Sequence, residues 1–77
     1  MTLQFSSLQK TISYSNVQAV FLPAYFGQAE ILPDHAEAFF ALQPGQIILK
    51  QENSSKEITI SQSALAYINN NHLIIIA

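Results

Sequence analysis

The sequence predicts an all-β fold, a flattened sandwich or barrel of short strands, on three observations. Apolar residues recur with a period of two in several segments, as they do in strands with one solvated face. Other segments are apolar at consecutive positions and rich in β-branched and aromatic residues, which favours strands over buried helices. Polar breaks separate these segments at short intervals, and many short strands with frequent turns are typical of sandwiches and barrels.

The segments with alternating character are LQFSS (3–7), KTISYSN (10–16) and KEITIS (56–61). In the first, Leu3 and Phe5 share one face of the chain and polar side chains occupy the other. A strand with this pattern packs one face on a core and leaves the other in water, so each segment is predicted to lie at the surface of a sheet.

The segments that are apolar on both faces are VQAVFLP (17–23), QIIL (46–49) and HLIIIA (72–77). Strands of this kind are covered on both sides. The second cover is either another layer of the same protein or the surface of a partner.

Turn residues lie between the segments. QPGQ (43–46) places proline before glycine, which is the signature of a type II turn. ENSSK (52–56) and NNNH (69–72) are polar, and asparagine tolerates left-handed backbone angles, so both are predicted to be hairpin loops. Gly27 and Gly45 stand alone and are interpreted as turn residues with positive φ.

The segment LPDHAEAFFALQPG (32–45) does not follow this pattern. Asp34 could cap a helix, with Glu37 three residues later as the reciprocal partner, and the apolar residues that follow have no clean strand spacing. A single helical turn ended by Pro44 and a compact loop are both compatible with this segment.

Size and composition point to a partner. The chain has 77 residues and is expected to form a single domain, 1–77. A domain of this size buries a modest core, and small domains are usually reinforced by disulfides, a metal or a partner. There is no cysteine, so disulfides are excluded.

Charge is scarce, at 10% of residues with three lysines and no arginine. Without clustered basic residues, neither nucleic acid nor an anionic membrane surface is an expected ligand. The longest uninterrupted apolar run, Leu73 to Ala77, is far shorter than the roughly 20 residues of a membrane span. The N-terminal residues lack the features of a signal peptide, which indicates a cytosolic protein or one on the cytosolic side of a membrane.

The segment 27–39 holds three of the five acids and is where a metal site or a catalytic site would lie. A metal site would use Asp34, His35 and Glu37, with His72 as a fourth ligand, but zinc favours Cys and His, and the two histidines are far apart in sequence. A hydrolase would combine a serine with His35 and an acid, yet no nucleophile elbow is present. The number of acids does not exclude a glycosidase pair of carboxylates, but a domain of this size is too small for a deep pocket as well as a core. No catalytic residue, metal ligand or cofactor is therefore predicted.

The order of several short motifs resembles a known family. These are Leu22-Pro23, Gly27, Ile31-Leu32-Pro33, His35-Ala36 and Gly45, followed by a C-terminal segment, SQSALAYINNNHLIIIA, that is similar to a final hairpin turning through asparagine. Together they resemble the N-terminal β-sandwich of the epsilon subunit of F-type ATP synthases, which is called delta in mitochondria. The resemblance covers nearly the whole chain, and it is the ordered set that carries it.

The chain departs from the family pattern at several positions. Ala24, Glu30 and Asp34 stand where the family has glycine, and Glu37 stands where it has proline after His-Ala. Ser63-Ala64 replaces the usual glycine pair. The family normally continues into a C-terminal helical hairpin that carries ATPase inhibition and, in some members, ATP binding; this chain is expected to lack that hairpin, so neither property is assigned to it.

The resemblance implies a flattened sandwich of about ten strands and a non-catalytic subunit of the rotor, or central stalk. Such a subunit joins the gamma subunit to the c-ring and couples ion translocation to ATP synthesis or hydrolysis. The implied location is the cytoplasmic face of the bacterial inner membrane, peripherally and without membrane insertion. An alternative from another class remains open, a free-standing small β-sandwich that binds a small ligand or a sugar.

The resemblance also implies contact residues. Gly27, Gln28, Ala29 and His35 are expected to contact the c-ring. Asp34, His35 and Phe39 are expected to contact the gamma subunit.

Overall fold

The structure, a computed structural model, describes every residue from Met1 to Ala77 and contains nine strands and no helix. The strands are β1 (Thr2–Ser6), β2 (Thr11–Tyr14), β3 (Val17–Ala24), β4 (Gly27–Ile31), β5 (Ala38–Leu42), β6 (Gly45–Gln51), β7 (Ser54–Ile60), β8 (Ala64–Asn69) and β9 (His72–Ile76). The predicted all-β class is confirmed, with nine strands in place of about ten.

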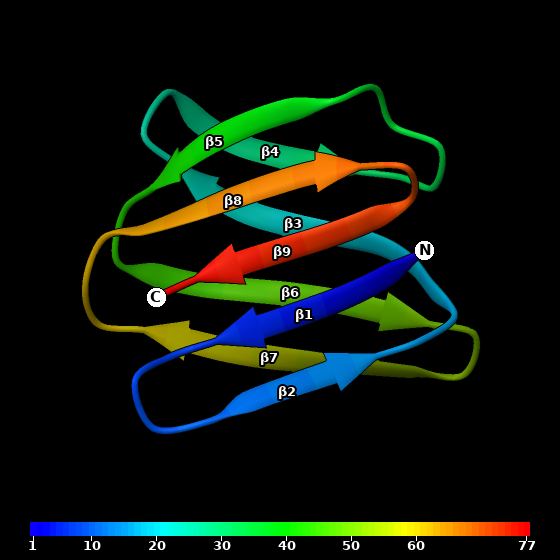
Figure 1. The fold of residues 1–77 in the computed structure, drawn as a ribbon, viewed down its shortest axis with the longest axis horizontal. Coiled ribbons are helices and arrows are strands. Elements are labelled where there is room, and N and C mark those ends of the chain that lie inside the picture. The colour runs from blue at the N-terminus through cyan, green and yellow to red at the C-terminus, as the bar shows by residue number, and fades with distance from the viewer.

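The strands form two facing layers (Figure 1). One layer has the order β5-β8-β9-β1-β2, and the other has the order β4-β3-β6-β7. Strand pairing crosses from one layer to the other at a single position, where Ala24 of β3 lies opposite Leu42 of β5. The result is a curled sheet flattened to 28 × 24 × 18 Å, as the predicted sandwich requires.

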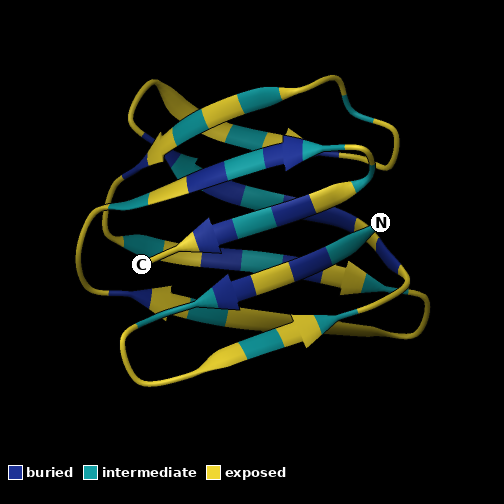
Figure 2. Ribbon diagram, viewed as in Figure 1, coloured by how far each residue is buried: buried dark blue, intermediate teal, exposed yellow.

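Side chains alternate between the core and the surface along most strands, as the period of two predicts (Figure 2). Leu3 and Phe5 of β1 point inward with Leu73 and Ile75 of β9, their neighbours in a parallel pairing. The other strand pairings in the sheet are antiparallel. Fifteen buried apolar residues from both layers make one contiguous core, and no polar or charged side chain is buried.

The segment 32–45 contains a loop and a strand, and the predicted helical turn is wrong. Asp34 has a φ of 66°, in the left-handed region, so it does not start a right-handed helix. Residues Ala38–Leu42 pair along their whole length with β8, because that strand offers them a complete ladder of backbone partners. The compact-loop alternative holds for residues 32–37 only.

Two of the predicted turns are confirmed and one differs. Asn70 and Asn71 adopt φ values of 49° and 64° in the β8–β9 hairpin. The β6–β7 hairpin turns at Glu52 and Asn53, which is shorter than predicted. Gly45 has a φ of 158°, positive as predicted, but it begins β6 instead of completing a type II turn.

Gly27 has a φ of 130°, which confirms the positive φ predicted for it. It is the first residue of β4 and closes the tight β3–β4 hairpin. The structure contains no helix with the length and apolar character of a membrane span.

Candidate functional site

The predicted contact residues lie in two separate places. Gly27, Gln28 and Ala29 begin β4, where the first two are exposed and Ala29 packs against the core. Asp34 and His35 lie in the loop that follows the other end of β4. Because a strand rises about 3.3 Å per residue, the length of β4 separates Gln28 from this loop. The structure therefore does not unite His35 with the other predicted c-ring contacts.

Aromatic rings bridge part of this distance. The ring of Phe40, on the inner side of β5, lies 6.1 Å from the ring of Phe26 and 6.2 Å from the ring of His35. Phe26 is in the β3–β4 turn beside Gly27. The ring of Phe40 thus lies between the β3–β4 turn and the loop that holds His35. The two predicted contact regions remain at opposite ends of this row of three rings.

The loop 32–37 is tied down by hydrogen bonds. The backbone N–H of His35 donates to the carbonyl of Leu32 at 3.2 Å, and the N–H of Asp34 donates to Oδ1 of Asn71 at 2.9 Å. The Nδ1 of His35 lies 2.6 Å from the carbonyl oxygen of Ala36, which can accept only if that nitrogen carries a proton. The bond to Asn71 holds the loop against the β8–β9 hairpin, and the contact with Ala36 involves the Nδ1 of the imidazole.

The four residues that a metal site would use do not come together around one point. Asp34, His35 and Glu37 line an open hollow of about 480 Å³ together with three asparagines of the β8–β9 hairpin. His72 instead contacts the hydroxyl of Thr2 through its Nδ1. No three His, Asp or Glu side chains are arranged to hold a metal ion.

Glu37 has a different partner, which the sequence did not indicate. The phenol of Tyr67, on β8, donates a hydrogen bond to Oε2 of Glu37, thirty residues away in the chain. The ring of Tyr67 also stacks on the ring of Phe39, with centroids 4.4 Å apart and planes 29° apart. The hydrogen bond to Glu37 and, to a smaller extent, desolvation and the negative charge of Glu37 raise the pKa of Tyr67, because ionisation would break the bond and place two anions together.

The substitution Glu37→Gln is expected to lower the pKa of Tyr67 towards 10.0, its ordinary value, because the neutral amide oxygen accepts a weaker hydrogen bond from the phenol than the carboxylate does and carries no negative charge. Tyrosine ionisation is followed by ultraviolet absorbance in an alkaline titration. The part of the absorbance change that belongs to Tyr67 should come at a higher pH in the parent chain than in the variant. The matched variant Asp34→Asn, which removes a carboxylate that does not touch Tyr67, should leave the curve unchanged; a curve that Glu37→Gln does not alter would contradict the assignment.

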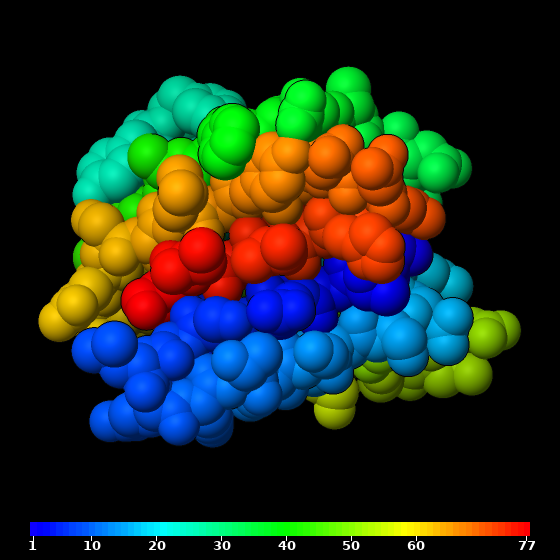
Figure 3. All heavy atoms as spheres, in the orientation of Figure 1, coloured from blue at the N-terminus to red at the C-terminus, as the bar shows by residue number.

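An apolar surface covers the outside of β5, β8 and β9. We call it the outer apolar face. It consists of two cross-strand rows, Phe39–Tyr67–Ile74 and Ala41–Leu65–Ile76. Phe39 is 67% exposed. Figure 3 shows these strands side by side on the face towards the viewer.

The outer apolar face ends sharply at β1. Gln4 lies beside Ile74, and Ser6 lies beside Ile76, and β2 continues the surface with Ser13 and Thr11. Surface patches that are contiguous and apolar mark interaction sites more often than scattered apolar residues do. The apolar part of this outer surface is therefore a candidate interaction surface, and the part on β1 and β2 is polar.

Sequence reasoning identified this feature in part. The segment 72–77 was predicted to have both faces covered, and Ile74 and Ile76 are its outward residues. Phe39 was predicted as a contact. Leu65 and Tyr67 were missed, because only the strand register shows that they lie between Phe39 and β9.

Comparisons with known proteins agree with one another. The family model described as ATP synthase, Delta/Epsilon chain, beta-sandwich domain matches residues 1–77. The ATP synthase epsilon chain of Wolbachia pipientis wMel is 35% identical over 74 residues, which cover 95% of this chain and 65% of the relative. The chain thus spans slightly less than two thirds of that relative.

Two solved structures share the fold. A chain of the Tetrahymena thermophila mitochondrial ATP synthase, central stalk and c-ring, has a TM-score of 0.81 at 12% identity, covering 99% of this chain and 61% of that one. A chain of the Euglena gracilis mitochondrial ATP synthase (OSCP/F1/c-ring) has a TM-score of 0.87 at 19% identity, covering 97% of this chain and 48% of that one. Because the family model matches from the first residue to the last, the chain belongs to the delta/epsilon chain family of ATP synthases, as its β-sandwich domain.

Proposed function

We propose that residues 1–77 form one domain that serves as a non-catalytic rotor subunit in the central stalk of an F-type ATP synthase. In this role it joins the gamma subunit to the c-ring and couples ion translocation to ATP synthesis or hydrolysis. The observation that carries the proposal is the outer apolar face, with Phe39 67% exposed, on a member of this family. Apolar surface of this kind is expected where a permanent partner covers it.

We propose the gamma subunit as the partner of the outer apolar face. Phe39 belongs to this face, and Asp34 and His35 lie in the loop that leads into β5. Apolar burial supplies affinity, and the polar loop beside it supplies orientation. This arrangement supports the contacts expected of Asp34, His35 and Phe39.

The c-ring is proposed to contact Gly27, Gln28 and Ala29, at the β3–β4 hairpin. His35 was expected at this contact as well, but it lies beyond the opposite end of β4. We assign His35 to the gamma subunit, with Asp34. The proposed location is peripheral, on the membrane sector, at the cytoplasmic face of the bacterial inner membrane.

Co-purification tests the proposal. The chain is expressed with the gamma subunit of the same organism, and the mixture is run on size exclusion. We expect a stable one-to-one complex. Separate elution of two folded proteins would contradict the rotor role and favour the alternative, a free-standing sandwich that binds a small ligand or sugar.

Two alanine variants should separate the proposed contacts. Gln28→Ala is expected to reduce retention of the c-ring and to leave gamma binding unchanged, because Gln28 is exposed at the far end of β4 from His35. His35→Ala is expected to weaken gamma binding and to leave the c-ring in place. Each loss should be about two- to tenfold in affinity, the range of one polar contact.

The readout is the subunit composition of the rotor after affinity purification through gamma. If Gln28→Ala weakened gamma binding and His35→Ala reduced retention of the c-ring, the two partners would be assigned to the opposite ends of β4. Normal assembly in both variants would remove these two side chains from the proposed contacts.

A further inference from the structure

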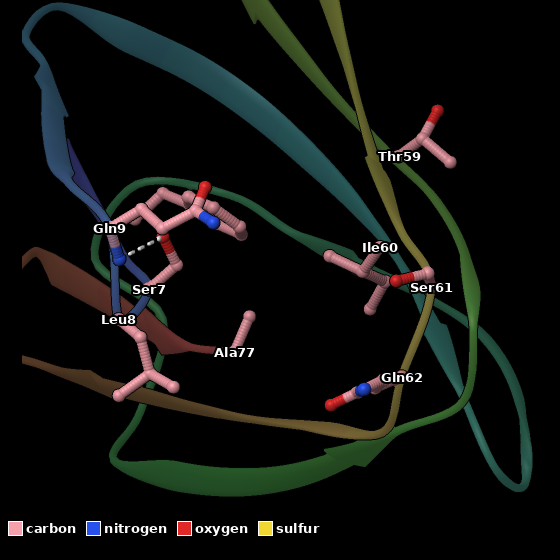
Figure 4. A pocket seen from close by; sticks show the side chains of 9 residues that line it. Ser7, Leu8, Gln9, Thr59, Ile60, Ser61, Gln62 and Ala77 are labelled. Carbon is pink, nitrogen blue, oxygen red and sulfur yellow. Dashed lines mark hydrogen bonds between the residues drawn. The ribbon is translucent and has the colours of Figure 1, made fainter.

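One edge of the sandwich is not closed by strand pairing. The sheet runs from β2 at one end of its path to β7 at the other, and β7 pairs with β6 alone. Both end strands lie at the bottom of Figure 1. A hollow of about 380 Å³ opens between the end of β7, at Thr59 and Ile60, and the β1–β2 connection, at Ser7–Gln9 (Figure 4). One side of β7 therefore has no neighbouring strand.

β7 is the longest strand that pairs with one neighbour only. It has seven residues, against four in β2 and five in β4. The unpaired N–H and C=O groups of an edge strand are a template for another strand, and a long edge offers more of them. β7 ends in Ile-Thr-Ile, and β-branched residues favour strands. The edge of β7 is thus the place where a second chain would most readily extend the sheet.

Two charged residues, Lys56 and Glu57, stand in the middle of β7. Directly opposite residues of an antiparallel pair share a face. Lys56 is opposite the buried Leu49, so it is on the core side of the sheet, although it is exposed at the edge. Glu57 is opposite Ile48 and is on the outer side. Each face of this edge strand therefore carries one charge, in a chain with only three lysines and five acids.

The partner most easily evaluated for this edge is a second copy of the chain. Two identical antiparallel strands that continue one sheet are related by a two-fold axis perpendicular to it, which places one residue opposite itself. The register that pairs the whole of β7 is centred on its fourth residue, Glu57. Glu57 is then opposite Glu57 of the copy, and Lys56 is opposite Ile58 of the copy.

The two charges oppose this register on both faces. The Cβ atoms of directly opposite residues are about 4.5–5.5 Å apart, and like charges at that separation are destabilising. On the core side, Ile58 packs against the core, so Lys56 of the copy would lose hydration against an apolar neighbour.

The neighbouring registers meet the same obstacle. A shift of the copy by two residues in one direction places Lys56 opposite Lys56. A shift by two residues in the other direction places Ile58 opposite itself and moves Lys56 beside the buried Ile60. Each register with extensive overlap therefore contains a repelling pair or a lysine set against an apolar residue.

We propose that Lys56 and Glu57 prevent β7 from pairing with β7 of a second copy, and that this edge becomes a dimer interface when both charges are removed. Charged side chains on an edge strand, including charges on its core side, are a general protection against edge-to-edge association. The inference is independent of the proposed rotor function, because β7 belongs neither to the outer apolar face nor to the β3–β4 hairpin.

The test compares the parent chain with the variant Lys56→Val/Glu57→Thr, whose new residues favour strands. Sedimentation velocity over a range of concentrations measures association. We expect the variant to dimerise with a Kd at least about tenfold lower than that of the parent, because one like-charge pair and two desolvated lysines are removed from the interface. Amide hydrogen exchange in β7 should be slower in the variant, because pairing protects the edge N–H groups.

A mixing experiment tests the register. Lys56→Val and Lys56→Val/Glu57→Lys each place like charges opposite one another in a homodimer. In an equimolar mixture, Glu57 of one chain is opposite the lysine introduced in the other. The mixed dimer, identified by native mass spectrometry, should be about three- to tenfold tighter than either homodimer. Equal association would contradict the role given to Glu57.

The matched control is Lys50→Val/Glu52→Thr, which also removes one lysine and one acid. Lys50 is on β6, which is paired on both sides, and Glu52 is in the β6–β7 turn. This variant should sediment like the parent, because surface substitutions outside an interface have small effects. The comparison is repeated with Phe39→Ser in every chain, since the outer apolar face offers another way for two copies to associate. Circular dichroism confirms that each variant is folded.

Three results would overturn the inference. One is a folded Lys56→Val/Glu57→Thr variant that associates no more than the parent. Another is equal dimerisation of the matched control, which would make the loss of charge in general the cause. The third is dimerisation that Phe39→Ser abolishes, which would assign it to the outer apolar face. None of these results bears on the rotor function, which co-purification with the gamma subunit tests separately.

Discussion

Replacing Phe39 with serine is expected to weaken association with the gamma subunit by about ten- to a hundredfold, the equivalent of one large apolar side chain lost from an interface. Phe39 is 67% exposed and stacks on Tyr67, which lies in the middle of its cross-strand row in the outer apolar face. Large aromatic residues that a partner buries often carry a large share of binding energy. The affinity of the gamma subunit for the parent chain and for the variant is measured by isothermal titration calorimetry or surface plasmon resonance.

The matched control for Phe39→Ser is Leu32→Ser. Leu32 is also a large exposed apolar residue, and it lies outside the two cross-strand rows. Its replacement should leave gamma affinity within about twofold of the parent. Equal losses from both variants would mean that general surface hydrophobicity drives association. An unchanged affinity in Phe39→Ser would place gamma on another surface.

Phe39→Ser should also leave the fold intact. The residue is on the solvent side of β5, so the core loses nothing, and the stack with Tyr67 contributes about 0.5–1.5 kcal/mol at most. A small decrease in thermal stability is therefore compatible with the interpretation. Loss of binding in a folded variant then reports on the interface.

The parts of the fold that could be predicted from the sequence are those set by local residue pattern. β1, β2 and β7 were expected from strict alternation, and β9 from its continuous apolar run. The β8–β9 turn followed from asparagine's tolerance of positive φ. In each case the information lies within a few consecutive residues.

β5 could not be predicted from the residues in the same way. Its sequence, Ala-Phe-Phe-Ala-Leu, is apolar at every position, and a capping pattern precedes it, so helix and strand are not distinguished locally. The ladder to β8, more than twenty residues downstream, decides the outcome. The parallel pairing of β1 with β9 is likewise a long-range choice that no local pattern encodes.

The candidate site shows the same limit. Gln28 and His35 are close in sequence, and the extended chain of β4 places them at opposite ends of the sandwich. Glu37 and Tyr67 are distant in sequence, and the β5–β8 pairing brings them into hydrogen-bond contact. Sequence reasoning located the segments that form the site, whereas the register decides which side chains share a surface.

Shortening Leu42 to alanine should have the largest effect on stability. Leu42 is fully buried and ends β5 at the one position where strand pairing joins the two layers, opposite Ala24. Truncation of a buried leucine costs about 2–5 kcal/mol, because apolar burial is lost and a cavity remains. For a chain of this length the total stability is roughly 4–12 kcal/mol, so a large share of it would be removed.

Thermal denaturation followed by circular dichroism measures this effect, and a decrease in Tm of at least about 10 °C is expected for Leu42→Ala. Leu65→Ala is the control, since Leu65 lies on the solvent side of β8 in the outer apolar face and is 44% exposed. It should lower stability by less than about 1 kcal/mol while weakening gamma binding. The opposite result would have Leu65 essential for folding and Leu42 dispensable. It would mean that the outer apolar face, and not the junction of the two layers, supports the fold. The outer apolar face would then not be free to bind a partner.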